Sequence, residues 1–216
     1  MSFTHEPGGR PFAGRVALVT GAARPRGIGR ATAVALACGG ADVACLDIAR
    51  PYSDAPFHGT ASGDDLDALV AELTALGVRA TAVQADVADE AAVEDAVTRA
   101  TEELGTVTLL ANVAGGSGPG FGLGPLLTVP AEEFRRVLDV NVVGTWLVSK
   151  ACANRMVAAG VGGRICKRVE PGGQARLRPP RPLLRGQGGH HLADPDDGDR
   201  AGRPGHRGQR RVPGHG

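Results

Sequence analysis

The sequence predicts an α/β fold with a doubly wound parallel sheet. Short apolar segments alternate with amphipathic segments of about 13 residues, which is the pattern of βαβ units. A glycine or a polar residue follows each of four apolar segments, namely Gly21, Asp47, Asp86 and Asn112. Right-handed crossovers place all such positions at the carboxyl edge of one sheet, where ligands bind.

The first strand is expected over residues 15–20 and its helix over residues 27–39. Between them, Gly21 can make a tight turn, Gly27 can let a phosphate approach the backbone, and Gly29 can let helix and strand pack closely. The N–H groups and the positive dipole end of the helix favour an anion there. The turn therefore predicts a phosphate cradle, with an ordinary strand–helix turn as the alternative.

The later elements follow from similar signals. Ser62 with Asp65 predicts a capping box, Gly77 ends that helix, and Asp89 caps the next one. In the last long helix, Phe134, Val137, Leu138, Asn141, Val142 and Thr145 share one face. We expect strands over 41–48, 78–83 and 107–111, helices over 62–77, 89–104 and 131–159, and a fifth strand beginning at 162–165.

Length and composition narrow the protein class. A chain of 216 residues fits one domain, and the opening residues hold no apolar run, so neither a signal peptide nor a membrane span is expected. The four cysteines form no Cys-x-x-Cys pair (Cys38, Cys45, Cys152 and Cys166). That usage indicates reduced thiols in a cytoplasmic protein, without a metal site.

Two compositions are joined near Ile165. Residues 1–165 carry 13 Lys and Arg against 18 Asp and Glu, a balance of −5, whereas residues 166–216 carry 11 against 5, a balance of +6. The second part has no Phe, Tyr, Trp, Ile or Met, and 18 of its 51 residues are Gly or Pro. Such a segment buries too little apolar surface to offset its ordering entropy, so a basic, unstructured tail is predicted.

Over residues 12–165 the chain resembles the short-chain dehydrogenase/reductase family. The matching motifs are Thr20-Gly21, Gly27-Ile28-Gly29, Asp47, Asp86-Val87, Asn112-Val113-Ala114-Gly115, and Asn141 within residues 139–144. The spacer between the first two glycines is longer than the family pattern by an Arg-Pro pair. The resemblance implies an NAD(P)-binding Rossmann domain over residues 1–165, incomplete because it stops after the start of the fifth strand.

The resemblance implies NAD as the cofactor. Asp47 would accept hydrogen bonds from both hydroxyls of the adenosine ribose and would repel a 2′-phosphate. Arg24, Arg26 or Arg50 could instead attract that phosphate, which leaves NADP open. The glycine-loop residues Gly21, Arg26, Gly27, Ile28 and Gly29 are expected to contact the cofactor.

Other cofactor contacts are implied by the same resemblance. Asp86 and Val87 would contact the adenine, and Asn112 with Ala114 and Gly115 would form the wall beside the adenine ribose. On its own, Asp86 could equally be a plain strand-end cap.

Asn141 is the one catalytic residue that the resemblance carries over. In the family this asparagine holds a water molecule in a proton relay. A buried amide is costly unless it is paired, so a purely structural helix-pairing role is the alternative.

The implied reaction is hydride transfer between NAD(P) and an alcohol or ketone. It needs a tyrosine base beside a lysine, written Tyr-x-x-x-Lys in the family, and a serine about thirteen residues earlier. This chain has one tyrosine, Tyr52, and its lysines are Lys150 and Lys167, so the motif is missing. A catalytically inactive dinucleotide-binding remnant is therefore the alternative function. The resemblance also implies a homo-oligomer for the intact protein.

Three explanations compete for residues 166–216. A basic tail could bind nucleic acid, but no aromatic residues interleave for base stacking, so no nucleic-acid partner is expected. A solvated linker is the second explanation. The third is translation in a shifted reading frame.

The genetic code favours a frameshift. Residues 166–170 can be encoded by TGT AAA CGT GTC GAG, which one base later reads Val-Asn-Val-Ser-Ser, with serine at the position of Glu170. The same shift can give tyrosine at Leu183 and lysine at Gln187, at the family's spacings. Residues 205–214 can likewise shift to a stretch resembling Gly-Ile-x-Val-Asn-Ala-Val-Cys-Pro-Gly. The missing elements should leave Val142, Trp146, Leu147 and Val148 partly exposed.

Overall fold

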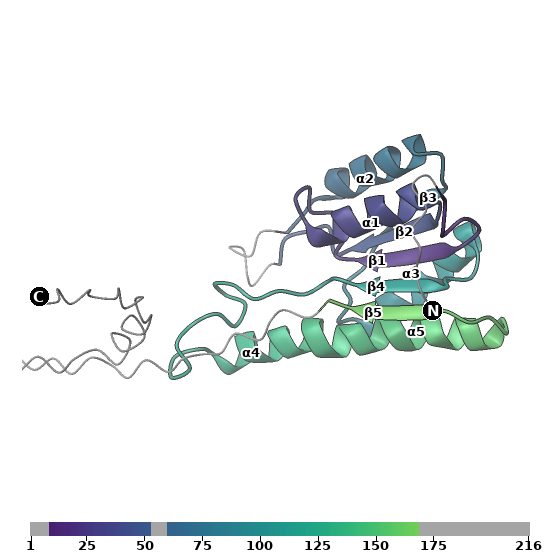
Figure 1. Cartoon of the computed structure of the whole chain (residues 1–216). Helices are drawn as coiled ribbons and strands as arrows, with labels where there is room; N and C mark the ends of the chain where they lie inside the picture. Colours follow the sequence, from purple (N-terminus) through teal and green to yellow (C-terminus); the bar gives the residue numbers. More distant parts are fainter. Residues whose placement is uncertain (1–8, 53–59, 169–216) are drawn as a thin grey trace, which may run out of the picture. The chain divides into compact units, whose positions relative to one another are not determined.

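The computed structural model describes residues 9–52 and 60–168. In this part of the chain five strands form one parallel sheet in the order β3-β2-β1-β4-β5. The elements are β1 (Val16–Thr20), α1 (Ile28–Cys38), β2 (Asp42–Asp47), α2 (Gly63–Ala75), β3 (Ala80–Gln84), α3 (Glu90–Leu104), β4 (Leu109–Asn112), α4 (Ala131–Leu138), the π-helix η1 (Asp139–Val143), α5 (Gly144–Ala158) and β5 (Arg164–Lys167). Helices α1 and α2 cover one face of the sheet and α3 with α5 covers the other, so the doubly wound prediction is confirmed (Figure 1).

The sheet separates two apolar cores. All five residues of β1 are buried, and they alternate between the two faces. Ala17 and Val19 belong to the core under α1 and α2, whereas Leu18 packs in the core under α3 and α5. Burial on both faces explains why the strands read as continuous apolar runs.

Local signals fixed the helix starts. Ser62 and Asp65 form the predicted capping box, with the Asp65 N–H donating to Ser62 Oγ at 3.2 Å and the Ser62 N–H donating to Asp65 Oδ2 at 2.9 Å. Asp89 caps α3 by accepting from the Ala92 N–H at 3.1 Å.

Each predicted strand lies within about two residues of the observed one.

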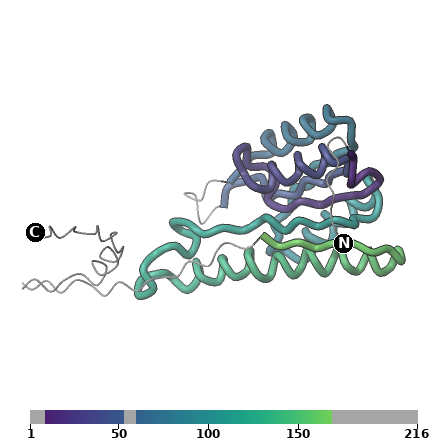
Figure 2. Tube along the Cα trace, in the orientation of Figure 1, coloured from purple at the N-terminus to yellow at the C-terminus, as the bar shows by residue number. Residues whose placement is uncertain are grey.

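The helix expected over 131–159 is not a single α-helix. Figure 2 shows one continuous rod of chain, but its middle turn is the π-helix η1. Asn141 sits in this turn, and its Nδ2 donates to the carbonyl of Val137 at 2.9 Å. A side-chain amide that pairs with the preceding turn is a known cause of such local irregularity.

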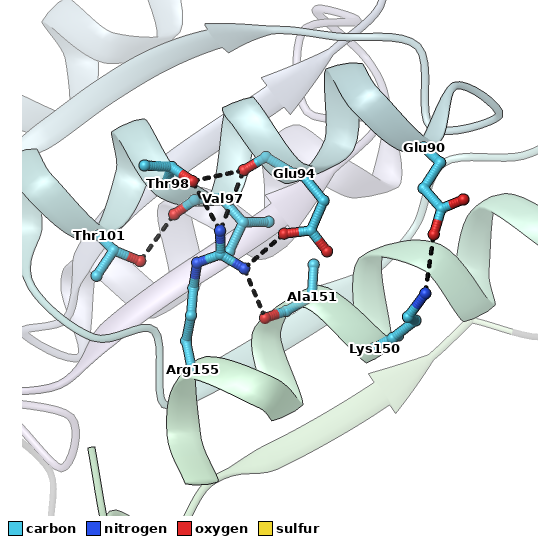
Figure 3. Close-up of polar contacts among 8 residues, drawn as sticks. All are labelled: Glu90, Glu94, Val97, Thr98, Thr101, Lys150, Ala151 and Arg155. Atoms are coloured by element: carbon cyan, nitrogen blue, oxygen red, sulfur yellow. Dashed lines mark hydrogen bonds and ion pairs between the residues drawn. The ribbon is translucent and has the colours of Figure 1, made fainter. Parts of the chain in front are cut away.

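Polar contacts join α3 to α5 (Figure 3). Lys150 Nζ lies 2.8 Å from Glu90 Oε1, and Arg155 Nη1 lies 2.9 Å from Glu94 Oε2. Arg155 Nη2 also donates to Thr98 Oγ1 at 2.7 Å. Because Arg155 bonds two residues of α3, it fixes the register of α5 against that helix.

The exposed apolar face on η1 and α5 is smaller than predicted. Val142 and Trp146 are exposed, as expected, but Leu147 and Val148 are buried. The expectation for these two residues was wrong because they pack in the core that α5 shares with α3. All four residues of β5 are exposed.

Several predictions fall on residues outside the described part. They concern the tail from Val169 onward and the proposed frame-shifted positions Glu170, Leu183 and Gln187. Within residues 9–52 and 60–168, no helix has the length and apolar character needed to cross a membrane. The same residues contain no group of three or more His, Cys, Asp or Glu side chains that could hold a metal ion.

Candidate functional site

A cavity of about 550 Å³ lies at the carboxyl ends of the strands. Its volume is within the usual range for small-molecule sites. Most of the predicted site residues line it: Gly21, Arg26, Gly27, Ile28, Gly29, Asp47, Asp86, Val87, Ala114 and Gly115. Residues from four separate loops therefore converge on one cavity.

The glycine loop is built for close backbone approach. Gly21 has a φ of +67°, and a Cβ there would lie 2.8 Å from the Ala114 Cα. A Cβ on Gly29 would lie 2.0 Å from the Gly21 carbonyl oxygen, so only glycine fits between loop and helix. Helix α1 starts after Gly27 without a side-chain cap or an acidic residue in its first turn. Its N-terminal N–H groups are thus suited to an anion.

Asp47 links the glycine loop to the end of β2. Its side chain is buried, with Oδ2 accepting from the Ala23 N–H at 2.9 Å and Oδ1 accepting from the Ala49 N–H at 3.0 Å. Ala49 follows in the left-handed region, with a φ of +45°. The Asp47 carboxylate therefore shapes the loop as well as facing the cavity.

The next strand end brings Asp86 and Val87 to the cavity. Asp86 Oδ1 accepts from the Ala88 N–H at 3.0 Å, which is the strand-end cap considered as its alternative role. Asp86 nevertheless also lines the cavity. Val87 packs against α5 so closely that a Cβ on Gly144 would lie 2.7 Å from Val87 Cγ2.

Asn112 does not line the cavity. It is buried at the end of β4, and its Nδ2 donates to Ser149 Oγ on α5 at 3.0 Å. The loop after it is held instead by Thr20, whose Oγ1 accepts from the N–H groups of Val113 and Ala114, each at 3.0 Å. The sequence motif includes Thr20, but it does not show that the Thr20 hydroxyl holds the loop after β4. That contact appears only when β1 and β4 lie side by side in the fold.

Asn141 does not line the cavity, but its side chain bonds Gly116, which does. Its Nδ2 donates to the Gly116 carbonyl at 2.9 Å, and its Oδ1 accepts from the Gly116 N–H at 3.2 Å. Its own carbonyl accepts from Lys167 Nζ at 2.7 Å and from Thr145 Oγ1 at 2.8 Å. Partial burial lowers the pKa of Lys167 below its usual value. Both N–H bonds of the half-buried Asn141 amide are thus used, and its oxygen accepts a hydrogen bond.

Tyr52 and Phe121 also line the cavity, and neither was among the cofactor contacts that the sequence predicted. Their ring centroids lie 5.6 Å apart at an interplanar angle of 48°. Burial, followed by the nearby carboxylates of Asp86 and Asp47, raises the pKa of Tyr52 to about 12. In the sequence, each is an aromatic residue in a loop rich in Gly and Pro, and this is the only local sign that it could belong to a ligand site.

The cavity carries charge of both signs. Arg24, Arg26 and Arg168 line it together with Asp47 and Asp86. A ligand suited to this lining has an anionic centre for the glycine loop and hydroxyl or amino donors for the carboxylates. A dinucleotide has these features: its pyrophosphate is an anionic centre, and its ribose hydroxyls and adenine amino group are donors.

Comparisons with known proteins agree with this geometry. A family model described as short chain dehydrogenase matches residues 15–168. An uncharacterised NAD-dependent oxidoreductase of Mycobacterium tuberculosis is 37% identical over 152 residues, covering 70% of this chain and 53% of the relative. An L-rhamnose 1-dehydrogenase (NAD(P)(+)) of a Sphingomonas species is 38% identical over 155 residues, covering 70% of this chain and 53% of the relative.

The structural comparison gives the same result. The crystal structure of a short chain dehydrogenase from Mycobacterium paratuberculosis bound to NAD has a TM-score of 0.65 and 37% sequence identity, covering 73% of this chain and 56% of the other. The present chain spans about half the length of the curated relatives it matches.

Proposed function

The chain belongs to the short-chain dehydrogenase family, and from that premise we propose that it derives from an oxidoreductase that transfers a hydride between NAD(P) and a small alcohol or ketone. The observation that carries the proposal is the cavity at the carboxyl edge of the sheet, with its glycine cradle and the Asp47 carboxylate. Relatives named as NAD-dependent, and a relative structure bound to NAD, support it.

We assign the adenosine half of the cofactor to the residues around Asp47 and Asp86. Asp47 would accept from the ribose hydroxyls with the lone pairs that its two backbone bonds leave over. Gly21, Arg26, Gly27, Ile28 and Gly29 would hold the pyrophosphate. Ala114 and Gly115 would border the ribose, while Asn112 would act indirectly by anchoring β4 to α5.

NAD is the expected cofactor because a carboxylate at the Asp47 position repels a 2′-phosphate. Arg24 and Arg26 line the same cavity and keep NADP as the second cofactor to test. Bound NAD(P) supplies the hydride acceptor.

Asn141 stays our candidate for the proton relay. Its carbonyl already accepts two hydrogen bonds, from the Lys167 ammonium and the Thr145 hydroxyl, so a hydrogen-bonded chain starts at this atom. Its side chain holds Gly116 in place beside the cavity.

The chain as given is proposed to bind dinucleotide without turnover. Its sequence lacks Tyr-x-x-x-Lys, so the tyrosine base that this chemistry needs is missing. We propose that residues 1–165 form the nucleotide-binding part and that the following residues are read from a shifted frame. One choice of codons for residues 166–170 reads Val-Asn-Val-Ser-Ser one base later, which supports this reading. For the intact parent enzyme we propose a cytoplasmic homo-oligomer.

Two proteins test the proposal: the chain as given and a version whose coding frame is shifted by one base after Ile165. Both should bind NADH in a fluorescence titration, and only the restored version should reduce NAD with a panel of secondary alcohols. Turnover by the chain as given would refute the inactive reading. A coding sequence without Tyr-x-x-x-Lys in the adjacent frame would end the frameshift idea.

A further inference from the structure

Tyr52 and Phe121 meet at the cavity from segments far apart in the sequence. Phe121 is 1% exposed, and the two rings are in tilted contact. Reciprocal backbone bonds with Gly118, at 2.8 and 3.0 Å, hold Phe121 in its turn. Arg136 on α4 fixes the same turn by donating to the Gly120 carbonyl at 2.8 Å. The Phe121 ring is therefore a rigid support for Tyr52.

The two rings form part of an apolar surface with acceptors at its rim. Val87 and Val140 line the same cavity as Tyr52 and Phe121. Burial first, and then the nearby carboxylates of Asp86 and Asp47, raise the pKa of the Tyr52 phenol, which stays protonated at neutral pH. A flat, apolar-faced ring that carries an amino donor on its edge matches this lining.

We propose that the rings of Tyr52 and Phe121 form the wall of the cavity against which the adenine ring of the dinucleotide packs, an inference that rests on the proposed function. Tyr52 contacts the base, and Phe121 positions Tyr52. The nicotinamide half makes no contact with this wall, so the wall contributes to affinity and not to the chemistry of hydride transfer.

The test uses the full chain and AMP, which carries the adenine and lacks the nicotinamide. Tyr52→Leu keeps an apolar side chain but removes the ring, and we expect its affinity for AMP and for NADH to fall about tenfold in calorimetry. Tyr52→Phe is the matched control, because it keeps the ring and should stay within about twofold of the wild type.

Spectroscopy separates contact with the base from a purely structural role. The chain has one tyrosine and one tryptophan, so in a Trp146→Phe background all tyrosine emission comes from Tyr52. Trp146 is exposed on α5 and is not a cavity residue. AMP should quench this emission at the concentrations that saturate binding.

Each outcome decides the proposal. Equal AMP affinity in Tyr52→Leu and wild type, or tyrosine emission that AMP leaves unchanged, overturns it, while retained NADH binding leaves the proposed function standing. If Tyr52→Leu fails to fold, the emission readout on the Trp146→Phe protein decides alone. If the wild type binds neither AMP nor NADH, both proposals are overturned. Binding of AMP without NADH overturns the proposed function only.

Discussion

The Asp47 carboxylate accepts a hydrogen bond from the Ala23 N–H at 2.9 Å, which ties the end of β2 to the glycine loop. The same carboxylate also accepts from the Ala49 N–H at 3.0 Å. One side chain thus sets the positions of two backbone segments that border the cavity. Its substitution should affect both stability and nucleotide binding.

Asp47→Asn should lower the free energy of unfolding by about 1–3 kcal/mol, because an amide has one accepting oxygen for two buried N–H donors. NADH affinity should fall as well. Urea unfolding and NADH titration measure the two effects. Asp67→Asn on the exposed face of α2 is the control and should change neither. A fully stable Asp47→Asn would show that these two bonds contribute little.

Gly29→Ala should destabilise the protein by about 3 kcal/mol, since the new Cβ would lie 2.0 Å from the Gly21 carbonyl oxygen and the loop must move. NADH binding should be lost with the loop geometry. The matched control is Gly63→Ala at the first residue of α2, where a Cβ meets nothing within 4 Å. That change should stabilise by about 0.5–1 kcal/mol in thermal unfolding. Comparable effects of the two substitutions would contradict the packing argument.

Asn141→Asp should be more harmful than Asn141→Ala. The Asn141 amide donates to the carbonyls of Gly116 and Val137, and a carboxylate would face both oxygens without a proton to donate. We expect a loss of about 3 kcal/mol for Asp in chemical unfolding. A smaller loss for Asp in acid than at neutral pH would support the charge argument, because protonation restores a donor.

Only two of the four thiols should react quickly in the folded chain. Cys45 and Cys152 are buried, and burial raises the pKa of each to about 12, so both stay protonated and inert at pH 8. Cys38 and Cys166 are exposed. Titration with a chromogenic disulfide reagent should therefore count two fast thiols before urea and four after it. Four fast thiols in the native protein would mean that the sheet core opens readily.

The sequence was sufficient for the order of strands and helices because burial on both faces and helix caps leave strong local signals. It also located the glycine loop and the strand-end acids, since each depends on its immediate neighbours. The π-helix at Asp139–Val143 was not predicted, because it depends on how the Asn141 amide is oriented: it donates both to the Val137 carbonyl one turn before and to the Gly116 carbonyl 25 residues away. The place of Tyr52 in the cavity was not predicted either, because it depends on contact with Phe121, a residue far away in the sequence.

The strand β5 has one neighbouring strand, β4, within the described residues, and all four of its side chains are exposed. A bare strand of this kind is a template for intermolecular pairing, which natural sheets suppress with charged or proline gatekeepers. Arg164 and Lys167 supply two such charges and flank Ile165 and Cys166. Replacing Ile165 with lysine would add a third charge to β5 and should reduce aggregation of the protein at high concentration.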